Sequence, residues 1–119
     1  MYQSAVYEVE LLTGKVAFRV GDGVPGAPGP FAVVTAYNPG RERPPAEVNE
    51  ARNRELLAEI ERRGFRWLPA EGRSGDGAHR EPSFAVFGLE LEDALQLARA
   101  FGQAAVCWFD GRVVRLAWC

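Results

Sequence analysis

The chain has 119 residues, with 14 Lys and Arg against 16 Asp and Glu, which gives a formal net charge of −2. Its length and its 47% hydrophobic content are typical of one globular domain that buries a core without a disulfide or a metal. The near-neutral charge argues against a broad nucleic-acid-binding surface. The apolar stretches are shorter than the ~20 residues of a membrane helix, and the first residues lack the basic region of a secretory signal. We therefore expect a cytoplasmic protein.

The spacing of apolar residues predicts seven strands and two helices. In chain order these are strands over residues 6–12, 16–20 and 31–37, a helix over 44–63, strands over 65–70 and 81–88, a helix over 91–101, and strands over 104–109 and 112–118. Residues 38–40 predict a turn in which Pro39 holds Asn38 extended. Residues 71–80 predict a mobile loop. Asp110 and Gly111 predict a two-residue type I′ hairpin.

From residue 31 onward the order is strand, helix, strand, strand, helix, strand. This order predicts a ferredoxin-like, two-layer α+β fold, an antiparallel sheet with two helices on one face. We expect a single domain over residues 1–119, with extra strands and a Gly/Pro loop in 1–30, the core in 31–109 and a hairpin extension in 110–119. Both faces of the last two strands are apolar, and the helices would cover one face only. The N-terminal strands or the second subunit of a homodimer should cover the other face.

Few residues are available for metal or nucleophilic chemistry. Cys107 lies in a predicted strand, where the two-residue hairpin would place it opposite Val114, and Cys119 ends the chain. His79, the single histidine, lies in a Gly-rich segment that predicts a solvated loop. We therefore predict no metal site, no cofactor and no internal disulfide. Lys15 is the only lysine and asparagine occurs three times, a composition compatible with a thermophile.

One set of polar residues does not fit an ordinary surface. A step of 100° per residue places Asn49 and Asn53 on the same helix stripe as Leu56 and Ile60, which should face the sheet. In a ferredoxin-like sheet, one edge also holds the end of the third predicted strand and the starts of the fifth and sixth. The residues that should converge there are Asn38, Asn49, Asn53, Glu81, Ser83 and Gln103, with Arg80 in the loop above them.

Two interpretations of this polar set remain open. In the first, the asparagines bond to backbone groups of the irregular segment 38–45, because an unpaired buried amide costs on the order of 1–3 kcal/mol. In the second, the set lines a pocket for a small polar or anionic ligand, over which Arg41, Arg43, Arg73 or Arg80 closes. The second interpretation makes the protein a non-catalytic binding or regulatory module.

Two other functions are alternatives. An enzyme would use Glu81 as a general base, with Asn38 and Gln103 orienting the substrate; a single carboxylate without a partner acid or a metal disfavours this role. A single-stranded RNA-binding domain would stack bases on aromatic side chains of the sheet, for which the candidates are Phe31, Tyr37, Phe84 and Phe87. The acidic pI of about 5.5 disfavours RNA binding.

Four short motifs lie in the same regions as the polar set. They are Thr-Ala-Tyr-Asn-Pro at residues 35–39, Asn-x3-Asn at 49–53, Glu-Pro-Ser-Phe at 81–84 and Phe-Gly-Gln-x-Ala-Val at 101–106. Together they resemble the pattern of a small bacterial family of domains of unknown function, over most of the chain from about residue 18. The resemblance implies no established activity. It implies only that these polar residues belong together.

Overall fold

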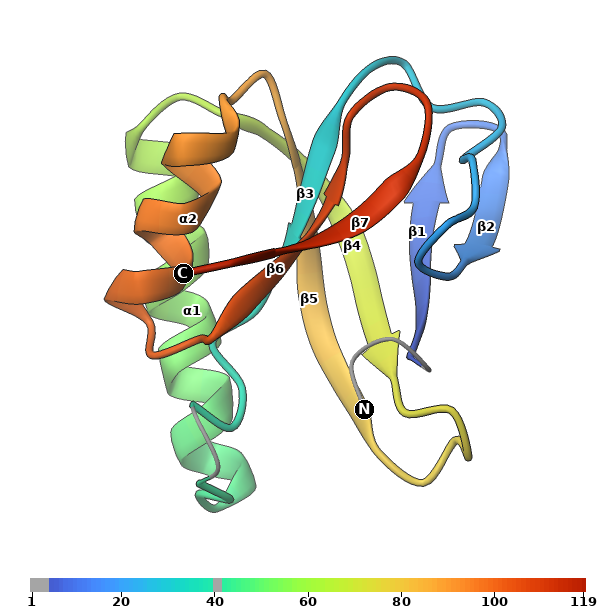
Figure 1. Ribbon diagram of the computed structural model, residues 1–119. Helices are drawn as coiled ribbons and strands as arrows, with labels where there is room; N and C mark the ends of the chain where they lie inside the picture. Colours follow the sequence, from blue (N-terminus) through green and yellow to red (C-terminus); the bar gives the residue numbers. More distant parts are fainter. Residues whose placement is uncertain (1–4, 40–41) are drawn as a thin grey trace.

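The computed structural model describes residues 5–39 and 42–119 as an α+β fold of one seven-stranded antiparallel sheet and two helices (Figure 1). The elements are β1 (Val6–Leu11), β2 (Gly14–Phe18), β3 (Phe31–Val34), α1 (Ala46–Arg62), β4 (Arg66–Arg73), β5 (Arg80–Phe87), α2 (Leu91–Ala100), β6 (Ala105–Phe109) and β7 (Val114–Trp118). Across the sheet the strand order is β2-β1-β4-β5-β3-β6-β7. Among the described residues, no helix is long and apolar enough to cross a membrane.

Both helices end as their sequences indicate. Gly64 follows α1 with a φ of +78°, which glycine adopts without steric cost. The N–H of Phe65 then donates to the carbonyl of Ile60, the hydrogen bond that closes a Schellman motif. The predicted buried stripe of α1 is confirmed, because the buried residues of this helix are Asn49, Asn53, Leu56 and Ile60.

The hairpin between β4 and β5 corrects the predicted loop over residues 71–80. The two strands pair as far as Arg73 opposite Arg80, so the loop contains only residues 74–79. Its ends are joined by a hydrogen bond of 2.9 Å from the N–H of Ser74 to the carbonyl of His79. The consequence is that Arg73 and Arg80 belong to strands rather than to a mobile loop.

The hairpin between β6 and β7 also differs from the prediction. Phe109 pairs with Val114, and Cys107 pairs with Leu116 rather than with Val114. A type I′ turn needs positive φ at both central residues, but only Gly111 has one, because the Asp110 carboxylate instead accepts hydrogen bonds from the backbone N–H groups of residues 112 and 113. The register therefore shifts by two residues, which leaves the predicted inward and outward faces unchanged.

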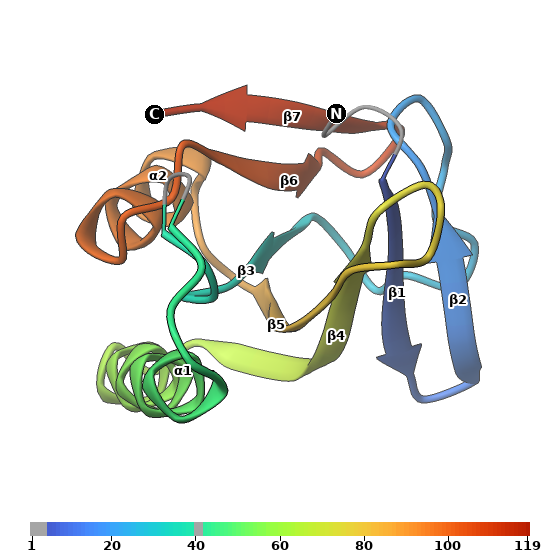
Figure 2. The same cartoon turned by 90° about the horizontal axis from the view of Figure 1, so that it is seen from below.

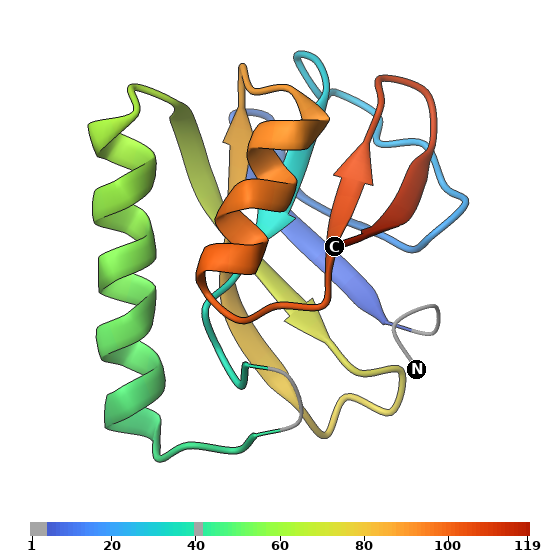
Figure 3. The same cartoon turned by 60° about the vertical axis from the view of Figure 1, so that its left-hand side comes forward.

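The sheet is curled, and each of its faces has a separate core. Figure 3 shows the two helices side by side against the sheet. The first core, between helices and sheet, contains Ala32, Val34, Val86, Val106, Trp108 and Ala117 of the strands, with Leu56, Ile60, Ala94, Leu97 and Ala98 of the helices. Figure 2 shows the sheet curving around its other face. The second core lies inside this curve and contains Tyr7, Val9, Leu11, Phe18, Val24, Phe31, Val33, Ala85, Cys107, Phe109 and Val114.

The N-terminal strands therefore cover the second apolar face, the first of the two expected solutions. Residues that follow β2 reach across the curve to the start of β7. The N–H of Gly21 donates to the carbonyl of Val114 at 2.8 Å, and the N–H of Val114 donates to the carbonyl of Asp22 at 2.8 Å. These two hydrogen bonds, which we call the clasp, close the curled sheet at the end where β6 turns into β7.

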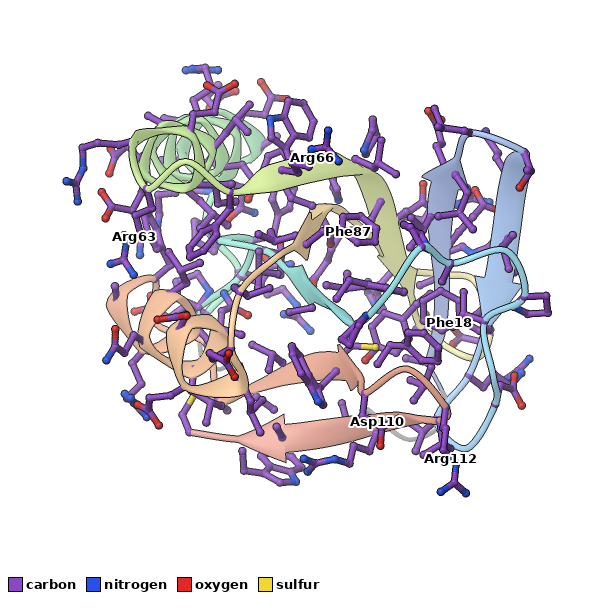
Figure 4. The ribbon with its side chains drawn as sticks, turned by 90° about the horizontal axis from the view of Figure 1, so that it is seen from above. Phe18, Arg63, Arg66, Phe87, Asp110 and Arg112 are labelled. Atoms are coloured by element: carbon purple, nitrogen blue, oxygen red, sulfur yellow. The ribbon has the colours of Figure 1, made fainter. Side chains whose placement is uncertain are left out.

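Phe31 is the centre of the inner core. Its side chain is fully buried, and its ring centroid lies 5.8 Å from that of Phe18, 5.2 Å from that of Phe87 and 5.3 Å from that of Phe109. Figure 4 shows Phe18 and Phe87 on the inner side of the curled sheet. Aromatic pairs at these separations add stability beyond the area that they bury.

We predict that Phe31→Ala lowers the free energy of unfolding by about 3–5 kcal/mol, the usual cost of truncating a buried phenylalanine. Urea denaturation followed by circular dichroism measures this change. Leu12→Ala is the control, because the Leu12 side chain is 99% exposed and its truncation should change stability by less than about 0.5 kcal/mol. A loss below about 1 kcal/mol for Phe31→Ala would contradict the central position of this ring.

Candidate ligand-binding cavity

A cavity of about 730 Å³ opens at the end of the curled sheet opposite the clasp. Figure 2 looks onto this end of the molecule. The walls come from the starts of β1, β5 and β6, the end of β4, the strand β3 and the segments that flank the helices. The lining residues are Ala5, Tyr7, Val33, Val34, Thr35, Asn38, Arg43, Gly72, Arg73, Ser74, His79, Glu81, Ser83, Ala98, Gln103, Ala104, Ala105, Val106, Cys107 and Leu116.

The backbone that leaves β3 forms one side of the cavity mouth, and α1 fixes its path. The N–H of Ala36 donates to Oδ1 of Asn53 at 2.8 Å, and the N–H of Asn38 donates to Oδ1 of Asn49 at 3.0 Å. Asn53 also donates through Nδ2 to the carbonyl of Pro82, at 2.9 Å. Two buried amides thus replace a neighbouring strand as partners of β3, which explains why this strand ends at Val34.

Asn38 connects this segment to β5. Its Oδ1 accepts a hydrogen bond from Nδ2 of Asn49 at 2.9 Å, and its Nδ2 donates to Oε2 of Glu81 at 3.0 Å. The φ angle of Asn38 is +47°, so the expectation of an extended residue before Pro39 is wrong. Asparagine tolerates this left-handed conformation better than most residues do, and the two side-chain hydrogen bonds hold it there. The predicted turn over 38–40 includes Gly40, which lies outside the described residues.

Gln103 reaches the same segment from the end of α2. Its Nε2 donates to the carbonyls of Tyr37 at 3.0 Å and of Phe101 at 3.4 Å. Gly102 positions it, with a φ of +74° at the end of the helix. A Cβ on Gly102 would lie 2.7 Å from the Cβ of Pro39, so only glycine permits this approach.

The start of β5 contributes the acidic side of the cavity. Glu81 lines the cavity, and Ser83, which is buried, donates through Oγ to the carbonyl of Glu81 at 2.9 Å. Thr35 donates through Oγ1 to the carbonyl of Pro82 at 2.9 Å and accepts a hydrogen bond from the N–H of Tyr37 at 3.1 Å. The hydroxyl groups therefore also stabilise the strand ends that form the mouth.

The structure brings four of the predicted site residues to the cavity wall, namely Asn38, Glu81, Ser83 and Gln103. Asn49 and Asn53 lie behind this wall. Their partners are the backbone of Ala36, Asn38 and Pro82 and the side chain of Asn38, whereas the first interpretation expected the backbone of residues 38–45. Arg80 is not among the lining residues. Its Nη1 lies 3.1 Å from Oε1 of Glu71.

The four arginines expected to close over a ligand have different surroundings. Arg43 lines the cavity and is exposed. Arg73 also lines it, but its guanidinium lies 3.7 Å from the carboxylate of Glu8 and 3.8 Å from that of Glu71. Arg80 is paired with Glu71 as described above, and Arg41 lies outside the described residues.

Sequence reasoning missed the apolar part of the cavity. Val33, Ala105, Cys107 and Leu116 line it from three neighbouring strands. Their alternate positions along β3, β6 and β7 indicate a shared face, but only the curl of the sheet turns that face into a cavity. His79 was assigned to a solvated loop; it is exposed and also lines the cavity.

The described residues contain no group of three or more His, Cys, Asp or Glu side chains that could hold a metal ion. Both cysteines are free thiols, Cys107 buried and Cys119 exposed. Burial raises the pKa of the Cys107 thiol far above its usual range, because the low-dielectric interior disfavours the thiolate. Cys107 therefore serves as a small apolar group of the cavity wall rather than as a nucleophile.

We predict that Asn53→Ala lowers the free energy of unfolding by about 2 kcal/mol, because it leaves the buried N–H of Ala36 without a partner. Chemical denaturation of the variant and the wild type measures this difference. Glu55→Ala is the matched control, since Glu55 is an exposed residue of the same helix. Equal stability of Asn53→Ala and the wild type would show that this amide does not support the end of β3.

We also predict that only one thiol reacts with iodoacetamide at pH 8 in the folded protein. The raised pKa of Cys107 keeps its thiol protonated at pH 8, whereas Cys119 is exposed. Mass spectrometry of the intact protein should show a single adduct, which Cys119→Ser removes. Rapid double alkylation under native conditions would mean that the inner core opens easily.

A family model described as a protein of unknown function (DUF3293) matches residues 34–106. This range contains the four polar residues of the cavity wall and the two asparagines behind it. Comparisons with curated proteins and with solved structures found no match.

Proposed function

We propose that this chain, which belongs to the family described as a protein of unknown function (DUF3293), is a non-catalytic binding or regulatory module for a small polar or anionic ligand. The observation that carries the proposal is the cavity of about 730 Å³, whose inner wall is apolar and whose mouth is polar. Cavities of this size that combine apolar walls with a few polar groups are typical ligand sites. The polar groups offered at the mouth are those of Asn38, Glu81, Ser83, Gln103 and Arg43.

The hydrogen bonds around the mouth support binding in a preformed site. Asn38 is held by Asn49 and Glu81, and Gln103 is held by two backbone carbonyls. A ligand would therefore meet side chains whose positions are already fixed, so little conformational entropy is lost on binding.

The enzyme alternative has less support. Gln103 uses Nε2 for two backbone carbonyls, which leaves it no N–H group to polarise a substrate carbonyl. Glu81 would then act with Asn38 alone, and Cys107 is too buried to serve as a nucleophile. Binding without reaction needs neither a polarising N–H group nor a nucleophile.

RNA binding also has less support. We interpret β3, β4, β5 and β6 with the two helices as a ferredoxin-like unit. The strand order expected for such a unit is β4-β5-β3-β6, and these strands are adjacent in that order in the sheet. RNA-binding domains of this type use the sheet face opposite the helices. Here that face forms the inner core, where Phe31 is buried and Phe87 packs beside it. Phe84 packs on the helix side against Trp67, so neither core leaves an open stacking platform.

We predict that at least one member of a small-molecule panel of carboxylates, phosphates, amines and alcohols raises the melting temperature of the wild type, as ligand binding to the native state requires. Ala105→Phe should abolish this shift, because it fills the cavity. The matched control is Ala17→Phe, the same change at an exposed position of β2, which should retain the shift. Differential scanning fluorimetry and then calorimetry measure both. Shifts that persist in Ala105→Phe would locate binding elsewhere.

A further inference from the structure

The register of β5 turns Glu81 toward the inside of the curled sheet. Glu81 pairs with Gly72 of β4, and Gly72 pairs with Tyr7 of β1, whose ring belongs to the inner core. Residues that pair directly across strands share one face. Gly72 has no side chain, and a Cβ there would contact the Tyr7 ring at 3.7 Å. The Tyr7 ring therefore lies over Gly72 on the same face of the sheet as Glu81, and both Tyr7 and Glu81 line the cavity.

Arg73 and Arg80, at the neighbouring strand positions, start from the opposite face of the sheet, and of the two only Arg73 lines the cavity. Arg73 and Arg80 pair with each other one position further along, so their side chains alternate away from that of Glu81. They form ion pairs there with Glu71, and Arg73 also with Glu8. The sequence interpretation had counted both arginines among the groups that close over a ligand.

The carboxylate of Glu81 is consequently uncompensated. Among residues 5–39 and 42–119, Glu81 forms no ion pair, and its side chain accepts a hydrogen bond from Asn38 only. An ionised carboxylate can accept about four hydrogen bonds, and covering one without a cation is unfavourable. Three basic side chains also line the cavity: Arg43 and His79 are exposed, and Arg73 is paired with Glu8 and Glu71.

We propose that the cavity selects a primary amine with an apolar body, whose ammonium group pairs with Glu81 and whose hydrocarbon part lies against Val33, Ala105 and Leu116. This inference rests on the proposed function: it keeps a small polar ligand in this cavity and replaces the anionic alternative with a cationic one. An ammonium group supplies both the missing charge and up to three donors. The apolar inner wall supplies the hydrophobic contribution, while an anionic head group at the same place would lie beside a carboxylate.

The test compares three probes that share one hydrocarbon chain, n-hexylamine, n-hexanol and hexanoate, by isothermal titration calorimetry at pH 7. We expect the wild type to bind hexylamine about tenfold more tightly than hexanol, and hexanoate least tightly. Glu81→Gln should remove the preference for the amine, so that hexylamine and hexanol bind with similar affinity, while the glutamine Oε1 still accepts the hydrogen bond from Asn38. Glu55→Gln, the same change on the exposed face of α1, controls for overall charge.

The outcomes separate this inference from the proposed function. The amine assignment is overturned if the wild type does not prefer hexylamine, or if the preference survives in Glu81→Gln. The binding module still stands in that case, provided that hexanol or hexanoate binds and that Ala105→Phe abolishes this binding. If none of the three probes binds, the amine assignment is overturned; if the wider panel also produces no shift, the proposed function fails with it.

Discussion

The structure depends on how the backbone of residues 36–38 is satisfied after it leaves the sheet. The strand pairing of β3 ends at Val34, and Ala36 is fully buried, so the N–H groups that follow need polar partners from within the protein. Asn53 and Asn49 supply them from a helix that otherwise packs with Leu56 and Ile60. The same contacts arrange the polar groups of the cavity mouth, because Asn38 also donates a hydrogen bond to the Glu81 carboxylate. The hydrogen bonds that support the end of β3 therefore also fix the polar side chains at the cavity mouth.

The second determinant is the curl of the sheet. A flat antiparallel sheet with helices on one face would leave the other face to solvent or to a partner. Here β1 and β2 extend the sheet so far around that their apolar residues meet β6 and β7 across an interior. Large aromatic rings around Phe31 fill one end of that interior. Small and medium side chains such as Ala105 and Leu116 line the other end, which is why space remains there.

Local chemistry in the sequence was sufficient for much of this. The apolar spacing located every strand and helix to within a few residues, and the 100° periodicity identified the buried face of α1, including its two asparagines. Prediction from the sequence failed where residues distant in the chain override the local backbone preference. Asn38 adopts a positive φ despite the following proline, because Asn49 and Glu81 hold its amide. The Asp110 carboxylate changes a predicted turn and shifts the register of β7. Arg73 and Arg80 were assigned to a mobile loop, because no local pattern specifies the pairing that makes them strand residues.

The clasp joins the segment after β2 to the start of β7. Two backbone contacts of Gly21 and Asp22 with Val114 determine how closely the outer strands approach each other at one end. The polar groups of the mouth lie at the other end, on different segments. The spacing of the outer strands and the polar groups of the cavity mouth therefore depend on separate stretches of sequence. A longer connection between β2 and β3 would therefore act on the clasped end of the sheet and leave the polar side chains of the cavity mouth in place.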